Sequence, residues 1–445
     1  MAEATLFEEQ SEMFRLLFVD KTCRFLPVCA ARGFGKSFGG ATLASAAVME
    51  LMMLDASVPN KNVYIVAPTY DDVKDTYYPI LAYELGMESM AIKASRDLGR
   101  FEFRNRVELR MLSYEAVERM RGKGCYFLVW DEVCYCKKGI PAKQAWEKVI
   151  QPSIRTRWSP ELAELYGAPS PGRALMSSTP QGYDFFYTMS TYHEEDDEWG
   201  FLKYDFHHSP FISVPEVERT RHQIDPISFA SEHDADFAES GSSVFYCFDR
   251  KIHVAKEVED FDDGEDVHVS IDFNVGIQAS GYFAVRGNQI QYVDESKGHP
   301  DTENLARSIK ERYIDEGHTV FAYPDPTGKA RKTSAPIGVT DLSILKSHGI
   351  RVRARPKSPP IKDSVQAVNT KLKTAAGDVD MYIHPRCKGL IESLERTRWV
   401  DHNPNSLTID KTDGLEHYSD GVRYSVEYLY PVRSGGRRTS RGFDF

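Results

Sequence analysis

"FLPVCAARGFGKSFGG" (Phe25–Gly40) combines an apolar run, a glycine-rich turn and the start of a helical pattern. The turn approximates the phosphate-binding pattern G-x-x-x-x-G-K-[ST]: Gly35–Ser37 fit it, whereas Ala30 stands in place of the first glycine. In such a loop, backbone N–H groups at a helix N-terminus surround the phosphates. Lys36 would reach the β- and γ-phosphates, and the Ser37 hydroxyl would bind Mg²⁺. Taken alone, the variant fits a glycine-rich strand-to-helix turn that binds nothing better than it fits a functional loop.

The size and composition of the chain are typical of a two-domain globular protein. Its 445 residues exceed what one ordinary core accommodates, and 41% of them are hydrophobic and 27% charged. The sequence holds no run of about 20 apolar residues that could span a bilayer, and its acidic start lacks the features of a signal peptide. We therefore expect a protein of the cytoplasm with no membrane partner, whose seven cysteines are reduced.

The charge of the chain limits how it could bind nucleic acid. A net charge of −11 argues against coating a polyanion through bulk charge, but it leaves room for a local basic channel. Two basic segments are candidates, Arg351–Lys362 and Arg433–Gly442. A solvated strand edge and a disordered tail would explain the same two segments without DNA.

The order of apolar and helical segments predicts an α/β protein with two folded parts. Residues 1–206 alternate strands with helices, which is typical of a mostly parallel sheet covered by helices. The pattern loosens over 207–263, where we expect a linker or small subdomain. A strand then opens a second module, 264–432, which continues through a hairpin, helices and further strands. The basic residues 433–445 are expected to form a disordered tail.

A second motif in the first half supports the phosphate-loop interpretation. The apolar strand "CYFLVWDE" ends in Asp131 and Glu132, about a hundred residues after the lysine of the loop. An aspartate there can hold Mg²⁺, and a neighbouring glutamate can orient or deprotonate the attacking water. The later strand "MSSTPQG" ends in Ser177, Ser178 and Thr179, which could sense the γ-phosphate and pass the signal on. A capped turn is the plainer reading of that last motif.

Arginines are needed to neutralise charge on a transferred phosphoryl group. Arg32 lies inside the loop, four residues before the lysine, and Arg121 precedes the acidic strand. Spacing alone leaves open whether either acts within its own subunit or on a neighbour. The candidate nucleotide-binding residues of the loop are Arg32, Gly33, Phe34, Gly35, Lys36 and Ser37.

Three acids in the second module stand out by their context. Asp272 lies in the apolar strand "VSIDFNV", Asp325 ends the strand "VFAYPDP", and Asp420 lies near the start of the last helix. An unpaired charge inside an apolar strand is costly, so such acids suggest metal ligands. Together they would form a two-metal site in an RNase H-like fold, with mixed strands and a closing helix. An ion pair for Asp272 and a simple turn at Asp325 are the alternatives.

Several further residues could support such a site. Glu303 and Asp294 are reserve metal ligands, and His417 or Asp413 could orient the ligands from behind. The residues Lys329, Arg331 and Lys332 follow Asp325 closely, where DNA phosphates would pass.

In combination these motifs resemble the large terminase subunit of tailed bacteriophages, the motor that packages DNA into capsids. The resemblance extends from about Leu6 to Leu429, and its motifs occur in the family's order: "AARGFGKS", "FLVWDE", "SSTP", "SEHDADFAESGSSVF", "SIDFNVG", "YPDPTG" and "YSDGVRYS". In that family the first glycine of the loop is often replaced, and an arginine stands four residues before the lysine. Arg32 matches that arginine.

The resemblance implies an ATPase domain that drives translocation of double-stranded DNA, joined to an RNase H-like endonuclease that cuts concatemers before and after packaging. It implies ATP and Mg²⁺ for the first, and two Mg²⁺ or Mn²⁺ ions at Asp272, Asp325 and Asp420 for the second. Arg121 is the best match for a finger acting on the neighbouring subunit, and Gln10 for a glutamine that contacts adenine.

The resemblance also implies partners and a location. These are a portal protein, a small terminase subunit and a ring of copies of this chain, expected to be a pentamer, whose subunits could be monomeric in solution. The protein would work in the host cytoplasm, docked transiently on the procapsid, and would be absent from the mature virion.

Three other classes of protein remain open on the sequence. A DNA helicase or remodeller would share the ATPase motifs but not the strand-borne acids of the second module. A nuclease that its ATPase half merely regulates, or an integrase-like recombinase, would share both. A structural capsid or portal-associated protein could carry vestigial motifs.

Overall fold

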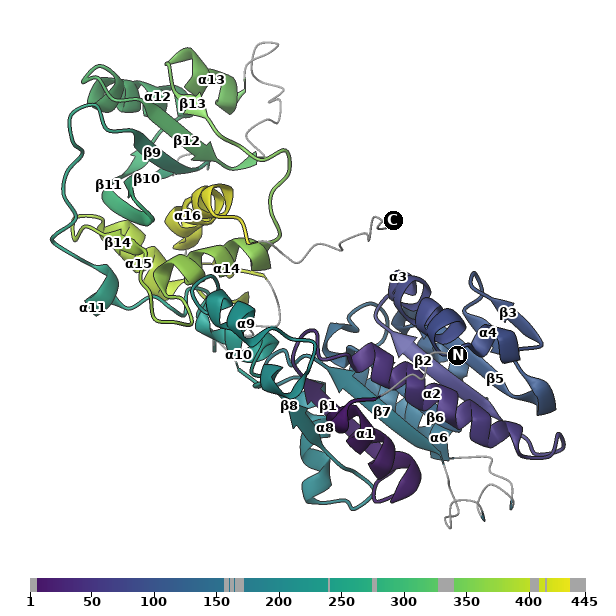
Figure 1. The fold of residues 1–445 in the computed structure, drawn as a ribbon. Coiled ribbons are helices and arrows are strands. Elements are labelled where there is room, and N and C mark those ends of the chain that lie inside the picture. The colour runs from purple at the N-terminus through teal and green to yellow at the C-terminus, as the bar shows by residue number, and fades with distance from the viewer. Residues whose placement is uncertain are drawn as a thin grey trace, which may run out of the picture. The chain divides into compact units, whose positions relative to one another are not determined.

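The computed structural model describes residues 6–155, 160, 164, 172–238, 241–273, 278–326, 340–400, 408–412 and 414–432. The chain forms two compact units (Figure 1), which are Met1–Val217 with Ala230–Glu239, and Glu218–Phe229 with Ser240–Phe445. The segment 207–263, expected as a linker, supplies residues to both units. Within the described ranges, no helix is long and apolar enough to cross a membrane.

The first unit is built on an eight-stranded sheet with the order β3-β4-β5-β2-β6-β7-β1-β8. Its strands are β1 (Phe25–Ala30), β2 (Asn62–Ala67), β3 (Lys93–Ser95), β4 (Arg100–Glu102), β5 (Glu108–Ser113), β6 (Phe127–Asp131), β7 (Arg173–Ser178) and β8 (Leu202–Tyr204). The six strands from β5 to β8 in that order pair in parallel, while β3, β4 and β5 form an antiparallel edge. All six carboxyl ends therefore lie at one edge of the sheet.

Helices cover both faces of this sheet (Figure 1). They are α1 (Glu8–Phe14), α2 (Lys36–Met52), α3 (Tyr70–Asp72), α4 (Met87–Met90), α5 (Ala142–Ala145), α6 (Gln151–Arg155) and α8 (Phe185–Thr191). Two further helices, α9 (Val214–Thr220) and α10 (Pro226–Glu232), have residues in both units. Successive residues of a strand point to opposite faces of the sheet and so enter two different cores. On β2, Ile65 belongs to the core that contains α2, and Tyr64 belongs to the core on the other face. The helix α2 packs closely on the sheet, because a Cβ at Gly40 would lie 2.8 Å from Val129 Cγ1.

The second unit contains a mixed six-stranded sheet with the order β13-β12-β9-β10-β11-β14. The strands are β9 (Val267–Asp272), β10 (Gln278–Arg286), β11 (Gln289–His299), β12 (Val320–Pro324), β13 (Arg351–Val352) and β14 (Met381–Ile383). Strands β9, β12 and β13 run parallel, and β10 pairs antiparallel with both β9 and β11. The hairpin between β10 and β11 turns at Gly287, which has a φ of 66°, as the sequence predicts.

Helices pack on this sheet and carry one of the predicted site acids. They are α11 (Arg250–His253), α12 (Thr302–Ile309), α13 (Asp341–Ser347), α14 (Ile361–Leu372), α15 (Lys388–Arg396) and α16 (Glu416–Leu429). A close approach is made by Gly421 on α16, where a Cβ would lie 3.3 Å from the backbone N of Ile271 on β9. That approach brings Asp420, the residue before the glycine, against the strand that ends in Asp272.

Candidate functional sites

The phosphate-binding motif forms the turn between β1 and α2. Gly33 and Gly35 have φ values of 82° and 94°, a region that glycine adopts without strain, and Lys36 begins the helix. Ala30 is the last residue of β1, where the backbone is extended and tolerates a side chain. The replaced glycine therefore falls at a position that needs no glycine.

The side chain of Lys36 is buried at the carboxyl edge of the sheet, with 7% of the residue exposed. Its Nζ donates to the carbonyl oxygens of Ala30 (3.2 Å) and Ala31 (3.3 Å) and to Thr179 Oγ1 (2.9 Å). It also lies 3.4 Å from Glu132 Oε1. The ammonium group is thus held in place by three acceptors and one acid before any phosphate binds.

Four hydrogen bonds fix the carboxylate of Asp131 at the end of β6. Oδ2 accepts from Ser37 Oγ (2.9 Å) and Tyr77 OH (2.7 Å), while Oδ1 accepts from Ser177 Oγ (2.7 Å) and the N–H of Glu132 (3.1 Å). The hydroxyl and carboxylate oxygens of Ser37 and Asp131 are the hard donors that Mg²⁺ prefers, so this pair fits a magnesium ion. Sequence reasoning missed Tyr77, because nothing in its local pattern separates it from a core tyrosine.

Glu132 lies directly after the strand, in the left-handed conformation (φ 48°, ψ 53°). Its Oε2 accepts from Ser178 Oγ (3.3 Å) and from the N–H of Thr179 (3.2 Å). Burial raises the pKa of Glu132, against the charge of Lys36. A carboxylate with a raised pKa is a better proton acceptor for water than an ordinary surface glutamate.

The motif at the end of β7, Ser177–Thr179, therefore connects the other elements of the site. Ser177 contacts Asp131, Ser178 contacts Glu132, and Thr179 contacts both Glu132 and Lys36. If Lys36 or Glu132 moved, its hydrogen bonds to Ser178 or Thr179 would have to change, and the end of β7 would move with it.

Arg32 and Phe34 belong to the loop, and Gln10 of α1 contacts it. Arg32 is 57% exposed at its side chain, with Nη1 3.6 Å from Glu232 Oε2. Phe34 is buried and stacks on Tyr204, with the ring centroids 4.9 Å apart. Gln10 is buried, and its Nε2 donates to the carbonyl oxygen of Gly35 at 3.0 Å. The amide of Gln10 thus supports the loop itself.

Arg121 is the one predicted residue of this site that the structure places elsewhere in the unit. It precedes β6, so it lies toward the amino end of that strand, whereas the phosphate loop lies at the carboxyl edge. Its guanidinium donates to Glu118 Oε1 (3.0 Å from Nη2) and to the carbonyl oxygen of Lys148 (3.2 Å from Nη1). In this position it lies apart from the phosphate loop of its own chain.

In the second unit, the three predicted acids come from three elements that meet. Asp272 ends β9 and Asp325 follows β12, and these parallel strands are in register with Pro324 opposite Ile271. Ser270 and Asp272 alternate with Val269 and Ile271, which belong to the core on the other face, so the aspartate faces α16. Asp420 on α16 is 2% exposed.

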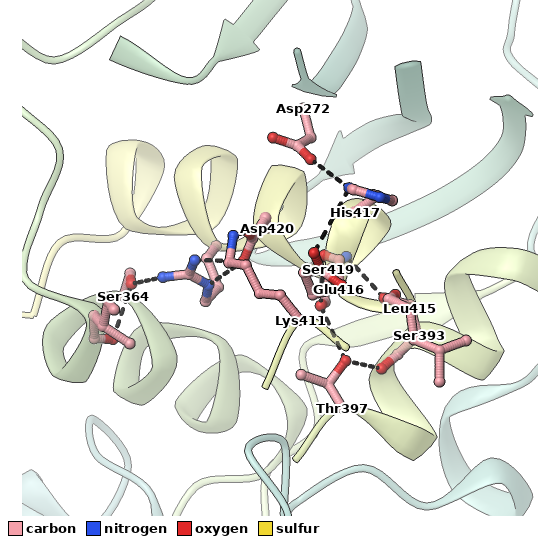
Figure 2. A network of polar contacts seen from close by, with 12 residues as sticks. Asp272, Ser364, Ser393, Thr397, Lys411, Leu415, Glu416, His417, Ser419 and Asp420 are labelled. Carbon is pink, nitrogen blue, oxygen red and sulfur yellow. Dashed lines mark hydrogen bonds and ion pairs between the residues drawn. The ribbon is translucent and has the colours of Figure 1, made fainter. Parts of the chain in front are cut away.

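The carboxylate of Asp272 is buried and only partly compensated. Its Oδ2 lies 3.0 Å from His417 Nδ1 (Figure 2). Burial, followed by the charge of Asp420, raises the pKa of Asp272 to about 6, although His417 opposes the shift. Asp420 precedes Gly421, which approaches the residue before Asp272, so the two carboxylates come from adjoining elements, and this suits a shared divalent cation.

Asp420 is held between two cations (Figure 2). Lys411 Nζ donates to Oδ2 at 2.8 Å, and Arg423 donates to Oδ1 through Nε at 3.2 Å. Arg423 is itself fixed by Ser364 Oγ on α14, 2.9 Å from Nη1. Burial raises the pKa of Asp420, but the charges and hydrogen bonds of Arg423 and Lys411 outweigh it and leave the pKa below its ordinary value. Neither cation was identified from the sequence.

Tyr424 on α16 is a half-buried tyrosine whose pKa is affected by all three acids. Its pKa is raised by burial and by the charges of Asp325, Asp420 and Asp272, against that of Arg423. Among the residues that the structure describes, however, no three His, Cys, Asp or Glu side chains are arranged to hold one metal ion.

The supporting residues named from the sequence have mixed outcomes. His417 contacts Asp272, whereas Glu303 contacts His348 (2.8 Å) and Asp294 pairs with Arg312. Asp413, Lys329, Arg331 and Lys332 lie outside the described residues.

The raised pKa of Asp272 predicts how pH affects the metal-free protein. The native pKa of about 6 lies above the ordinary value, so the native state binds a proton more strongly than the unfolded state. Protonation therefore adds stability below the unfolded pKa, and this is lost as pH rises through about 6. We expect Asp272→Asn to stabilise the protein in EDTA at pH 7.5 more than at pH 4.5, by at most about 3 kcal/mol. Denaturation of both proteins at the two pH values measures this, and an equal effect at both would contradict it.

Comparison with known proteins places these sites in a family context. No protein-family model matches the chain. A curated protein, the large subunit of terminase from Escherichia phage T5, is 24% identical over 421 residues, which is 92% of this chain and 87% of that protein. The chain resembles large terminase subunits. The resemblance seen in the sequence is thus confirmed.

Solved structures support the same relationship at the level of the fold. Crystal form 2 of the large terminase from a thermophilic bacteriophage matches with a TM-score of 0.51 and 13% identity, covering 95% of this chain and 98% of that one. Crystal form 3 of the same terminase matches with a TM-score of 0.50 and 14% identity over 96% and 99%. The predicted fold class, an α/β chain with a mostly parallel sheet in its first part and a mixed sheet in its second, is confirmed.

Proposed function

We propose that the chain is a DNA-packaging motor subunit that hydrolyses ATP and cuts DNA. The first unit is the ATPase and the second the nuclease, with domains at 1–206 and 264–432 joined through 207–263. The arrangement of Lys36, Asp131, Glu132 and Thr179 around the phosphate loop carries this proposal. The resemblance to large terminase subunits over 92% of the chain supports it.

In the ATPase, the residues of the loop bind the triphosphate and those of β6 and β7 act on it. Lys36 exchanges its carbonyl and hydroxyl acceptors for the β- and γ-phosphates, and Glu132 takes a proton from the attacking water. Ser37 and Asp131 would hold Mg²⁺, which neutralises phosphate charge when bound. Arg32 and, from a neighbouring subunit, Arg121 add positive charge to the transferred group.

In the nuclease, Asp272, Asp325 and Asp420 would hold two Mg²⁺ or Mn²⁺ ions. Bound ions of this kind activate water and stabilise the leaving oxygen of a phosphodiester. His417 orients Asp272, and Arg423 orients Asp420 through Oδ1. A metal ion would take Oδ2, which Lys411 contacts in its absence. Lys329, Arg331 and Lys332 contact the DNA backbone.

The remaining parts of the proposal concern assembly. The substrate is double-stranded DNA, and the partners are a portal protein, a small terminase subunit and further copies of the chain in a ring of about five. The protein acts in the host cytoplasm while docked on the procapsid.

A packaging assay tests the proposed function directly. The full chain, its small subunit, ATP and procapsids bearing portals are mixed with linear DNA, and DNA protected from added DNase is measured. We expect protection that depends on ATP. Hydrolysis and cutting without any protected DNA would instead favour a helicase or remodeller, or a nuclease regulated by ATP.

Lys411 is expected to compete with the metal ion for Asp420. Its ammonium occupies Oδ2, but its side chain is 60% exposed, so the pair contributes little and can be displaced. We expect Lys411→Met to tighten Mn²⁺ binding roughly threefold to tenfold, by removing a cation worth about 1 kcal/mol. Titration calorimetry without DNA measures the affinity.

Lys411→Arg is the matched control, since it keeps a cation at the same place and should leave the affinity near that of the wild type. Weaker binding by Lys411→Met would mean that Lys411 helps to organise the site instead of competing for it.

A further inference from the structure

The basic segment Arg351–Lys362 begins at the edge strand of the nuclease sheet. In β13, Arg351 lies opposite Phe321 of β12, and the two strands run parallel. The N–H of Arg353 donates to the carbonyl oxygen of Ala322 at 2.8 Å, so the pairing continues beyond the strand. The segment therefore runs beside β12 toward Asp325.

Strand direction places the segment at the same edge as the candidate nuclease acids. Because β9, β12 and β13 are parallel, their carboxyl ends meet at one edge, where Asp272 and Asp325 lie. The connection from β13 to α14 passes the end of β12 (Figure 1). The basic residues after β13 thus emerge next to the acids.

One arginine anchors this connection to the helix that carries Asp420. The guanidinium of Arg355 lies 3.1 Å from Glu427 Oε2 on α16, and its carbon lies 5.2 Å from the centroid of the Tyr428 ring. The glutamate is 9% exposed, whereas the side chain of Arg355 is 36% exposed, so only one partner of the pair is shielded from water. Arg355 therefore fixes the path of the segment between β12 and α16.

The other cations of the segment stay available to a ligand. Arg351, Arg353 and Lys357 are exposed. The two guanidinium groups lie 5.5 and 5.2 Å from the ring centroid of Phe321, which orients them without cancelling their charge. Within the ranges that the structure describes, none of these three residues forms an ion pair with a carboxylate.

We propose that this basic edge, Arg351, Arg353 and Lys357, binds the phosphate backbone of duplex DNA beside the nuclease acids. The inference rests on the proposed nuclease function and adds the surface that holds its substrate. A chain with a net charge of −11 repels DNA overall, and buried acids at the cutting site repel it further. Local cations at the same edge offset that repulsion, and contacts to phosphates carry no sequence preference.

The test measures DNA binding by the full chain in EDTA, so that neither metal nor cutting is required. The variant is Arg353→Glu with Lys357→Glu, titrated with a fluorescent duplex at several salt concentrations. Losing two phosphate contacts should reduce the slope of log K against log [salt] by about 2, and the affinity near 0.1 M salt by roughly tenfold or more.

The control is Lys251→Glu with Lys256→Glu, which makes the same change in charge. Both lysines are exposed and lie near Val254, which bridges to Ile383 of β14 at the opposite edge of the sheet. This variant should bind as the wild type does. All four substituted residues belong to the second unit, so thermal unfolding of each variant, followed by circular dichroism, checks that this unit is folded.

Two outcomes would overturn the inference, and only the second would also overturn the proposed nuclease function. If the Arg353 and Lys357 variant binds with the affinity and salt slope of the control while the wild type cuts plasmid DNA with Mn²⁺, only the basic edge is wrong. If the wild type neither binds nor cuts DNA, the proposed nuclease function fails together with its surface.

Discussion

Replacing Lys36 with alanine is expected to reduce ATP hydrolysis by roughly a thousandfold or more, about 4 kcal/mol of transition-state stabilisation. The ammonium group is buried and already aligned by Ala30, Ala31 and Thr179, so the loop loses an organised cation where phosphate charge develops. Its loss also leaves Glu132 without its neighbouring positive charge. Phosphate release by the purified full chain, with and without DNA, measures the effect.

Two comparisons make the result of the Lys36 substitution specific. Lys143→Ala changes an exposed lysine of the same unit, 3.9 Å from Glu147, and should leave hydrolysis unchanged. Cutting of DNA with Mn²⁺ should persist in Lys36→Ala, because the nuclease acids belong to the other unit. Normal hydrolysis by Lys36→Ala would remove the basis of the ATPase assignment.

Replacing Asp272 with asparagine is expected to abolish DNA cutting, with a loss of at least roughly a thousandfold. Asparagine has the shape of aspartate and can still meet His417, but it removes the negative charge that a divalent ion needs. The metal-free variant should be at least as stable as the wild type near neutral pH, since the buried carboxylate has a raised pKa. Loss of activity would then not be a consequence of unfolding.

Asp294→Asn is the matched control for that substitution. Asp294 lies on β11 of the same sheet and pairs with Arg312 of the segment after α12. It should cut plasmid DNA at the rate of the wild type, and both variants should hydrolyse ATP normally. A cutting-competent Asp272→Asn protein, or an inactive Asp294→Asn protein, would show that the metal site has been assigned to the wrong acids.

The fold class could be predicted, and the resemblance recognised, because both depend on short motifs of neighbouring residues. Each signal predicts a structural element from only a few neighbouring residues. Examples are the glycines before Lys36, the apolar run before Asp131 and the turn at Gly287. Parallel strands then fix which side chains share an edge, so Asp272 and Asp325 could be expected to meet. The roles given to these residues stay predictions until they are measured.

Other parts of the sites depend on contacts between distant segments. Tyr77 reaches Asp131 across 54 residues, and Arg423 is held by Ser364 across 59. Nothing in the local pattern around Tyr77 or Arg423 distinguishes them from ordinary core or surface residues. Which residue contacts Asp131 or Arg423 depends on which helices and strands pack together in the folded chain.

The sequence by itself determined the two-part α/β architecture, the phosphate loop and the acids at the ends of strands. These features can be read from the spacing of apolar residues, the positions of glycines and the acids that follow apolar runs. Only the tertiary structure decided which cations hold Asp420 and which residues share its edge. These contacts result from the close approach of Gly421 to β9 and from the parallel pairing of β13 with β12. Neither distance between elements can be read from the sequence.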